Sequence, residues 1–508
     1  MKNNQKPVAQ TLVHTLLNGA VKLFADRIFL LYKDQTYSYQ QFFNMVMHCA
    51  EKMLTAGVKI DDRVLLVAEN TPLFYVGYFA SWQIGAVAVP VNNFLKLAEI
   101  QHIITDCQPV FLICDDHRVE LLQNETVKTV FKGIFTQQLM SSDPWQKEPT
   151  NPPFDQLGPD KLAVLVYTSG TTGVPKGVML SSRNILTNIN QCVTRLEIGS
   201  EERVLCVLPL FHVFTQITCV WLAIKQGVSV VIVPKIERSH IIDGLAKKPT
   251  IVLGVPALFG LFCLFRNLDF SHVRLFVAGG DAMPDKIRSL FALLYGRKII
   301  NGYGLSEASP VVAVHLDDVM TYTNTIGKPL DGISYQIRPL TDLSQSPYTN
   351  PYQIGQLFIR GDNVMLGYYH DQKATEHALP NGWLDTGDCA YFDNDENIVI
   401  TGREKDLIIS KGFNIYPQEV ENIIALSQAV IRVAVVGKDD QMHGQVPIAF
   451  VQLRQEQKGI EKELSKLCAH HLASYKIPRL FKCSTEALPT TATGKVDKKQ
   501  LKKQLQEN

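Results

Sequence analysis

The stretch Tyr167–Val178, YTSGTTGVPKGV, decides how the rest of the chain is interpreted. It follows an apolar run, LAVLV, that is typical of a buried strand. Glycines let the backbone approach a ligand closely, hydroxyl and N–H groups donate to phosphate oxygens, and Lys176 adds a mobile positive charge. Lys176 precedes Gly177, so the spacing is not that of G-x-x-x-x-G-K-[ST], and GVMLSS indicates a second strand rather than a helix. The stretch therefore predicts a glycine-rich hairpin over a polyphosphate.

On both sides of this hairpin, short apolar runs alternate with segments of helical length. Runs such as Val64–Ala68 and Val204–Leu208 are bounded by turn residues or charges, and Tyr39–Thr55 and Pro72–Trp82 have the length of helices. Strands that alternate with helices predict parallel sheets covered by helices. The sequence therefore indicates an α/β protein with a large core.

The pattern changes in the last third of the chain. After about residue 330 short strands and turns dominate, and after Arg403 an α+β pattern resumes, with helices expected over Pro417–Leu426 and Lys458–Leu472. We expect an N-terminal domain over 1–403, which includes a β-rich subdomain over about 330–403, and a small mobile C-terminal domain over 404–508. The latter carries 16 Lys/Arg and 12 Asp/Glu, a charge of 16 − 12 = +4, which suits either a solvated surface or an anionic partner.

The composition excludes several classes of protein. The 508 residues carry 50 Lys and Arg against 49 Asp and Glu, so a nucleic-acid partner is not expected. The 10 cysteines form no C-x-x-C pair, which predicts reduced thiols in a cytoplasmic protein, and the N-terminus lacks an export signal. The apolar run Ile251–Phe265 has 15 residues, fewer than the roughly 20 that cross a bilayer. We interpret it as core, with at most peripheral membrane contact as the alternative.

Five further motifs follow the hairpin along the chain. They are LPLFHVF at Leu208–Phe214, AGGDAM at Ala278–Met283, NGYGLSEASP at Asn301–Pro310, GWLDTGD at Gly382–Asp388 with GREKDLIISKGFNIYPQE at Gly402–Glu419, and PTTATGKVDK at Pro489–Lys498. With Thr168–Gly177, which fits [ST]-S-G-[ST]-T-G-x-P-K-G, they stand in the order found in the adenylate-forming, or AMP-binding, superfamily. The chain resembles this superfamily over almost its whole length, and is most similar to fatty-acyl-CoA synthetases and 4-coumarate-CoA-ligase-like enzymes.

The resemblance implies an ATP-dependent acid–thiol ligase with two half-reactions. A carboxylate attacks the α-phosphorus of MgATP to give an acyl-adenylate and pyrophosphate, and the thiol of coenzyme A then displaces AMP. It implies catalytic roles for Lys495, His212 and Lys176, a metal site at Thr168 and Glu307, and a hinge at Lys405. The ATP- and AMP-binding residues would be Thr168, Ser169, Gly170, Thr171, Thr172, Gly173, Lys176, Gly280, Asp281, Asn301, Gly302, Tyr303, Gly304, Ser306, Asp388, Arg403 and Lys495.

Side-chain chemistry agrees with several of these roles. The ring of Tyr303 offers a surface for adenine, Ser306 can hydrogen-bond a phosphate, and Glu307 is a hard oxygen ligand of the kind that Mg²⁺ takes beside nucleotide phosphates. Asp388 and Arg403 would hold the ribose. Lys495 would reach the carboxylate and the α-phosphate, and Lys405 is expected to be exposed.

The acyl pocket is expected at His212, Phe214, Gly279, Gly302 and Val311, with Val220 and Val312 in an apolar wall. Because no Lys or Arg stands there to meet a second carboxylate, a medium- or long-chain fatty acid is favoured and an aromatic acid is the alternative. Some long-chain enzymes carry a gating Trp where this chain has Gln216. An acyl carrier protein as acceptor, a homodimer, a silent scaffold of the same fold and a generic NTPase stay open alternatives.

Overall fold

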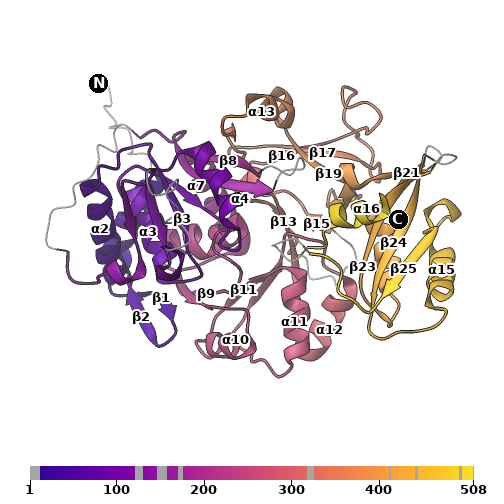
Figure 1. Ribbon diagram of the computed structural model, residues 1–508, viewed down its shortest axis with the longest axis horizontal. Helices are drawn as coiled ribbons and strands as arrows, with labels where there is room; N and C mark the ends of the chain where they lie inside the picture. Colours follow the sequence, from indigo (N-terminus) through magenta and orange to yellow (C-terminus); the bar gives the residue numbers. More distant parts are fainter. Residues whose placement is uncertain are drawn as a thin grey trace.

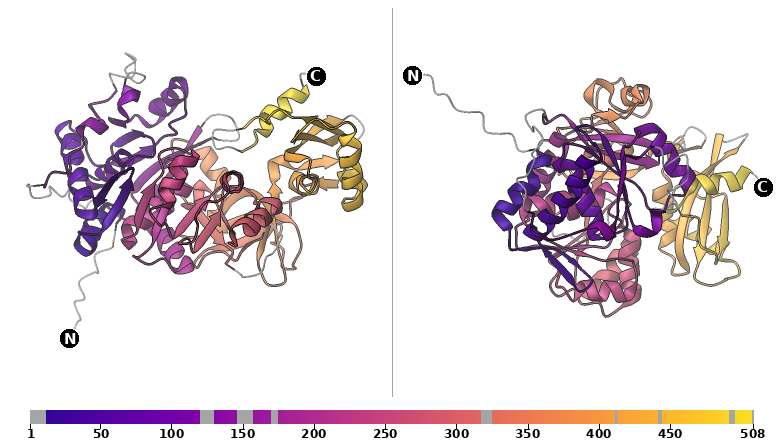
Figure 2. Two further views of the ribbon diagram at one scale, coloured as in Figure 1. Left: turned by 90° about the horizontal axis from the view of Figure 1, so that it is seen from below. Right: turned by 60° about the vertical axis from the view of Figure 1, so that its left-hand side comes forward.

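The computed structural model describes residues 12–119, 130–145, 157–169, 175–316, 325–410, 413–440, 444–490 and 495–506. The fold contains four β-sheets, and the strands of the first three interleave along the chain (Figure 1). The sheet formed by the last hundred residues, drawn in yellow, lies at one end of the molecule in Figures 1 and 2.

Two large sheets form the N-terminal part. The first has the order β14 (Val311–Val314), β13 (Ile300–Gly304), β12 (Leu275–Ala278), β11 (Ile251–Gly254), β9 (Arg203–Cys206), β10 (Ser229–Ile232), β1 (Ile28–Tyr32) and β2 (Gln35–Ser38). The second has the order β18 (Gly367–Tyr368), β8 (Pro175–Ser181), β7 (Leu162–Ser169), β4 (Val87–Pro90), β3 (Arg63–Val67), β5 (Phe111–Cys114) and β6 (Gly133–Phe135).

Both sheets are parallel in their centres, which confirms the predicted α/β class. Antiparallel pairs lie at the edges. Short connections allow the pairing of β1 with β2 and of β7 with β8, whereas β18 joins β8 from a distant part of the chain. The helices of this part are α1 (Leu16–Phe24), α2 (Tyr39–Thr55), α3 (Pro72–Gln83), α4 (Leu97–Cys107), α7 (Ser182–Leu196), α8 (Val213–Gln216), α9 (Ala223–Gln226), α10 (Arg238–Leu245), α11 (Pro256–Phe265) and α12 (Asp285–Tyr295).

The core of the N-terminal part joins the two sheets. All twelve residues of α3 are buried, as expected for a helix that is apolar on every side. Trp82 and Trp221 are among the largest fully buried side chains. The run Ile251–Phe265 divides into β11 and α11, and in the described part of the chain no helix is long and apolar enough to cross a membrane.

Two smaller sheets complete the fold. The antiparallel sheet has the order β15 (Thr325–Gly327), β20 (Ile398–Arg403), β19 (Leu384–Phe392), β17 (Gly355–Arg360) and β16 (Ser334–Arg338), with helix α13 (Gln372–Ala378) beside it. The C-terminal sheet has the order β22 (Phe413–Ile415), β21 (Ile408–Ser410), β24 (Gly444–Leu453) and β23 (Val430–Asp440), with β25 (Leu480–Ser484) on β24. Its helices are α14 (Pro417–Ala425), α15 (Ile460–His471) and α16 (Lys498–Gln506). All ten cysteines are free thiols, as predicted.

Candidate active site

The glycine-rich stretch joins two antiparallel strands, as predicted. Thr168 and Ser169 end β7 opposite Lys176 and Pro175 of β8. The predicted phosphate ligands Gly170, Thr171, Thr172 and Gly173 lie outside the described residues. A Cβ at Gly177 would lie 2.9 Å from Leu165 Cδ1 and 3.2 Å from Tyr369 Cβ, so a side chain here would require its neighbours to shift.

The side chain of Lys176, on β8, lies beside Tyr368 and Asp371. Its Nζ atom lies 3.4 Å from Asp371 Oδ2 and 5.3 Å from the centre of the Tyr368 ring. Tyr368 belongs to β18, which pairs with β8 through Tyr368 and Val178. The ring and the carboxylate therefore hold the ammonium group next to the phosphate hairpin.

Glu307 is anchored by the same tyrosine. Tyr368 Oη donates a 2.9 Å hydrogen bond to Glu307 Oε1, and the amide of Met365 donates to the Glu307 carbonyl at 2.8 Å. Burial and the neighbouring Glu307 carboxylate raise the pKa of the Tyr368 hydroxyl, which therefore stays a donor. Within the described ranges, Glu307 Oε2 accepts no hydrogen bond, so a half-buried carboxylate oxygen is available to a divalent cation.

A second buried carboxylate lies at the end of the antiparallel sheet. Asp388 Oδ2 accepts a 2.6 Å hydrogen bond from Tyr303 Oη, and Asp388 Oδ1 lies 3.1 Å from Arg403 Nε. Asp388 and Arg403 face each other in register on β19 and β20. Burial raises the pKa of Asp388, whereas Arg403 and the Tyr303 hydrogen bond lower it. The structure thus brings together three of the predicted nucleotide-binding residues.

Glycines allow the strands and loops at this site to approach closely. A Cβ at Gly304 would overlap the Pro310 carbonyl oxygen, and one at Gly302 would lie 3.0 Å from Val277 Cγ1. Gly280 is exposed and adopts φ +81°, a conformation that side chains disfavour. Next to them, the Asn301 amide donates to the Thr325 carbonyl at 2.9 Å and accepts from Arg288 at 2.8 Å. The side chain of Asn301 therefore links β13 to Arg288 of α12 and to Thr325 of β15.

Lys495 approaches this site from the C-terminal part of the chain. Its ammonium group interacts electrostatically with His212, Asp281 and Asp388, which belong to three separate N-terminal motifs. Lys495 has solvent-exposed surface, but the surrounding protein lowers the pKa of its ammonium group, and Arg403 lowers it further. Burial and Lys495 lower the pKa of His212 to about 4, so this imidazole is neutral at pH 7. Lys405, two residues beyond Arg403, is exposed as predicted.

The residues that were predicted to line an acyl pocket differ in burial. Phe214 and Val311 are half-buried, and a Cβ at Gly279 would lie 2.9 Å from Phe214 Cζ. In contrast, Val220 and Val312 are fully buried in the main core cluster, so they pack the fold instead of forming an apolar wall.

The residue that follows the pocket, Gln216, is fully buried in a polar network. Tyr78 Oη donates to Gln216 Oε1 at 2.8 Å and accepts from Trp221 Nε1 at 3.0 Å. Gln216 Nε2 donates to the Phe211 carbonyl at 2.9 Å. These bonds fix Gln216 in place, and the helix changes to π geometry directly after it, over Ile217–Leu222.

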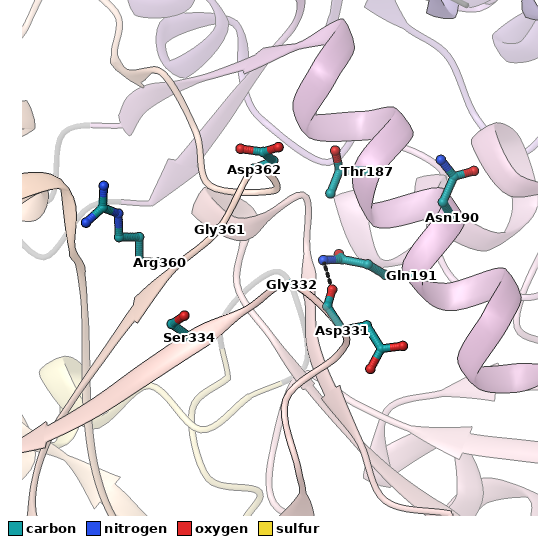
Figure 3. Close-up of a pocket in the computed structure, with 9 residues that line it drawn as sticks. All are labelled: Thr187, Asn190, Gln191, Asp331, Gly332, Ser334, Arg360, Gly361 and Asp362. Atoms are coloured by element: carbon teal, nitrogen blue, oxygen red, sulfur yellow. Dashed lines mark hydrogen bonds between the residues drawn. The ribbon is translucent and has the colours of Figure 1, made fainter.

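A separate polar cleft lies between α7 and the antiparallel sheet (Figure 3). Thr187, Gln191, Asp331, Arg360 and Asp362 are among its lining residues. Gln191 Nε2 donates to the Asp331 carbonyl at 2.7 Å across it. None of the predicted site residues lines this cleft, which is therefore not part of the candidate active site.

Sequence reasoning missed Tyr368 and Asp371. A signal was present, because Asp371 accepts a hydrogen bond from the Ala374 amide and so caps α13 in a D-x-x-A pattern. Gly367 and Tyr368 stand four and three residues before this cap. Nothing in the sequence, however, indicates that this segment pairs with β8.

Residues 17–369 match the AMP-binding enzyme family, and residues 419–495 match the AMP-binding enzyme C-terminal domain. The chain belongs to the AMP-binding enzyme family. This confirms the resemblance that the motifs indicate, and the protein is an AMP-forming acyl-CoA synthetase. Its substrates are therefore a small carboxylic acid, ATP and coenzyme A.

The proteins that are similar to this acyl-CoA synthetase are named for several different carboxylic acids. A long-chain-fatty-acid–CoA ligase of Bacillus subtilis is 29% identical over 99% of this chain and 96% of its own. A feruloyl-CoA synthase of Amycolatopsis is 32% identical over 92% of this chain and 93% of its own. Among solved structures, an o-succinylbenzoate CoA synthetase of B. subtilis with its acyl-adenylate intermediate has a TM-score of 0.85 at 27% identity, covering 96% of this chain and 98% of that one.

Proposed function

We propose that this acyl-CoA synthetase activates a medium- or long-chain fatty acid as its acyl-adenylate and transfers the acyl group to coenzyme A. The observation that carries the proposal is the approach of Lys495 to His212, Asp281 and Asp388, beside a site that already holds Arg403. The full-length similarity to a long-chain-fatty-acid–CoA ligase and the half-buried ring of Phe214 support an apolar substrate.

The first half-reaction joins two anions. A carboxylate oxygen of the acid forms a bond to the α-phosphorus, while the bond from that phosphorus to the pyrophosphate oxygen breaks. No general base is needed, because the carboxylate is already a nucleophile. Lys495 and Lys176 offset the charge of the reacting oxygens, and the site positions the two anions against their repulsion.

The second half-reaction transfers the acyl group. The thiol of coenzyme A loses its proton to the solvent and its sulfur forms a bond to the acyl carbon. The bond from that carbon to the phosphate oxygen breaks, so that AMP leaves. A neutral His212 beside the acyl group adds no positive charge that would attract water or hold the departing AMP.

The donor set fits a magnesium ion. Glu307 and Thr168 would hold it, because Glu307 is fixed through one carboxylate oxygen and the hydroxyl of Thr168 stands at the end of β7. When bound, Mg²⁺ supplies positive charge that stabilises the phosphate oxygens.

The chain divides in this proposal after Arg403. The body 1–403 keeps the nucleotide, and the domain 404–508 rotates at Lys405 between the two half-reactions, taking Lys495 with it. The exposed position of Lys405 supports this division, since an exposed residue can change its backbone angles without breaking core contacts.

An aromatic acid is the second candidate substrate. The feruloyl-CoA synthase of Amycolatopsis is 32% identical. Gln216, whose amide donates to the His212 carbonyl at 3.0 Å, belongs to a buried hydrogen-bond network with Tyr78 and Trp221. A rigid end to the pocket favours a short, flat substrate.

The variant Lys495→Ala tests the catalytic assignment. We expect it to abolish pyrophosphate release from ATP and acid, but to spare the transfer of a supplied acyl-adenylate to coenzyme A. Lys503→Ala, an exposed lysine of α16, is the matched control and should retain both steps. Equal loss of both half-reactions in Lys495→Ala would contradict the assignment.

A substrate panel tests the choice of acid. Pyrophosphate release is measured with octanoate, dodecanoate, hexadecanoate and ferulate, with coenzyme A present. Highest kcat/KM with dodecanoate or hexadecanoate supports the first candidate, and highest kcat/KM with ferulate supports the second. Acid-independent phosphate release, or no turnover with any acid, would contradict both.

A further inference from the structure

Helix α11 is unusual for a helix at the protein surface. Its sequence, PALFGLFCLF, contains no charged residue and no amide or hydroxyl side chain. One side packs on the first sheet through Leu258, Phe259 and Phe262, which are at most 3% exposed. The opposite side carries Leu264, which is 75% exposed, where a surface helix normally has polar residues.

The neighbouring helix α12 extends this apolar surface. Leu290, Leu293 and Leu294 are 42%, 82% and 40% exposed. We call Leu264, Leu290, Leu293 and Leu294 the leucine face. Helices α10, α11 and α12 lie together at the lower edge of the molecule in Figure 1.

Contacts between α11 and α12 place the four leucines on one surface. A Cβ at Gly260 would lie 3.4 Å from Ile287 Cδ1, and Tyr295 Oη donates to the Phe262 carbonyl at 2.7 Å. Leu264 follows Gly260 by one helical turn, and Leu290 and Leu294 follow Ile287 by one and two turns. The exposed leucines of the two helices are therefore adjacent.

The sequence segment that carries α10, α11 and α12 is basic. Residues 235–298 contain 10 Lys and Arg and 5 Asp and Glu, a charge of 10 − 5 = +5, whereas the whole chain has +1. Arg266 directly follows α11, and Arg297 lies two residues beyond the end of α12. An apolar surface with a positive surround complements an anionic lipid surface. A second copy of the chain would instead bring two basic segments together, which opposes association through this face.

We propose that the leucine face docks on anionic membranes, with the leucines in the lipid interface and Arg266 and Arg297 at the headgroups. A ten-residue helix is about 15 Å long, too short to span a bilayer, so α11 would lie in the plane of the membrane. This docking is independent of which acid the enzyme activates.

Vesicle sedimentation tests the proposal. The full chain is mixed with vesicles of phosphatidylcholine, either alone or with 30% phosphatidylglycerol. We expect binding to the anionic vesicles that weakens with added salt, because the headgroup contacts are screened. The double variant Leu264→Glu/Leu293→Glu should bind at least tenfold more weakly. Leu23→Glu, also 75% exposed but on α1, is the matched control and should bind like the wild type.

Two further measurements complete the test. Both variants should retain wild-type kcat/KM with a water-soluble acid, since none of these leucines belongs to the candidate active site, and this shows that they are folded. Light scattering reports the oligomeric state. Absence of wild-type binding, or unchanged binding of the double variant, would overturn the proposal. So would a wild-type dimer that the double substitution converts to a monomer without any vesicle binding.

Discussion

Replacing Tyr303 with phenylalanine is expected to weaken both the fold and the binding of ATP. The substitution keeps the ring and removes only the hydroxyl that donates to Asp388 Oδ2 at 2.6 Å. Because the side chain of Asp388 is 7% exposed, water cannot readily replace this donor. A hydrogen bond to a buried charge contributes about 1.5–3 kcal/mol. Since Arg403 still pairs with Asp388 Oδ1, we expect a value near the lower end, or about a tenfold rise in the Kd of ATP.

The pH dependence gives this prediction its second readout. The Tyr303 hydrogen bond lowers the pKa of Asp388, whereas burial raises it. Without the hydroxyl the pKa rises, so the carboxylate becomes protonated at a higher pH as the solution is acidified. ATP binding, if it requires the carboxylate as acceptor, should therefore be lost at a higher pH in Tyr303→Phe than in the wild type.

Calorimetric titration of ATP from pH 5.5 to 8, together with urea unfolding, measures both effects. Tyr352→Phe is the matched control, because Tyr352 is 56% exposed and its ring lies beside that of Tyr391, at 5.7 Å between centres. A wild-type Kd and a wild-type free energy of unfolding in Tyr303→Phe would refute the reasoning.

Three further changes have expected outcomes. Asp371→Asn removes the carboxylate that pairs with Lys176. Because exposed ion pairs are weak, ATP should bind at most about fivefold tighter by titration, and weaker binding would contradict this. Burial lowers the pKa of His14 to about 4, below its unfolded value, so the wild type loses stability as the pH falls. Between pH 7.5 and 5 this loss is about 2 kcal/mol in urea unfolding, and His14→Leu should avoid it. An equal loss of stability in the variant and the wild type would contradict this. In Gly279→Ala the new methyl group should displace the ring of Phe214 and lower kcat/KM for the acid more than for ATP. An equal fall in kcat/KM for both substrates would exclude Gly279 from the acid pocket.

Elements with strong local signals were predictable from the sequence. The helix Tyr39–Thr55 has the expected bounds, because Ser38 caps its first turn. The Ser38 hydroxyl accepts from the Gln41 amide, and the Ser38 amide donates to Gln41 Oε1. The hairpin around Lys176 was also predictable, since glycines interrupt two apolar runs of strand length. In these two elements, residues that are close in sequence are sufficient to predict the secondary structure.

The environment of the charged groups was not predictable in the same way. Tyr368 reaches Glu307, 61 residues away, only because β18 pairs with β8, and no local pattern specifies that pairing. Likewise, the motif that contains Asn301 does not reveal that its amide bonds to Arg288 and to the Thr325 carbonyl. Long-range strand pairing and buried polar partners depend on the complete fold.

The pairing of β19 with β20 has a consequence for protein engineering. Asp388 and Arg403 face each other in register, and Lys405 stands exposed two residues later. A hybrid enzyme joined directly after Arg403 would keep both partners of this ion pair on one parental segment. Its second parent would contribute only the residues from Glu404 onward. The acceptor specificity of relatives could then be exchanged without changing the Asp388–Arg403 pair of the proposed nucleotide site.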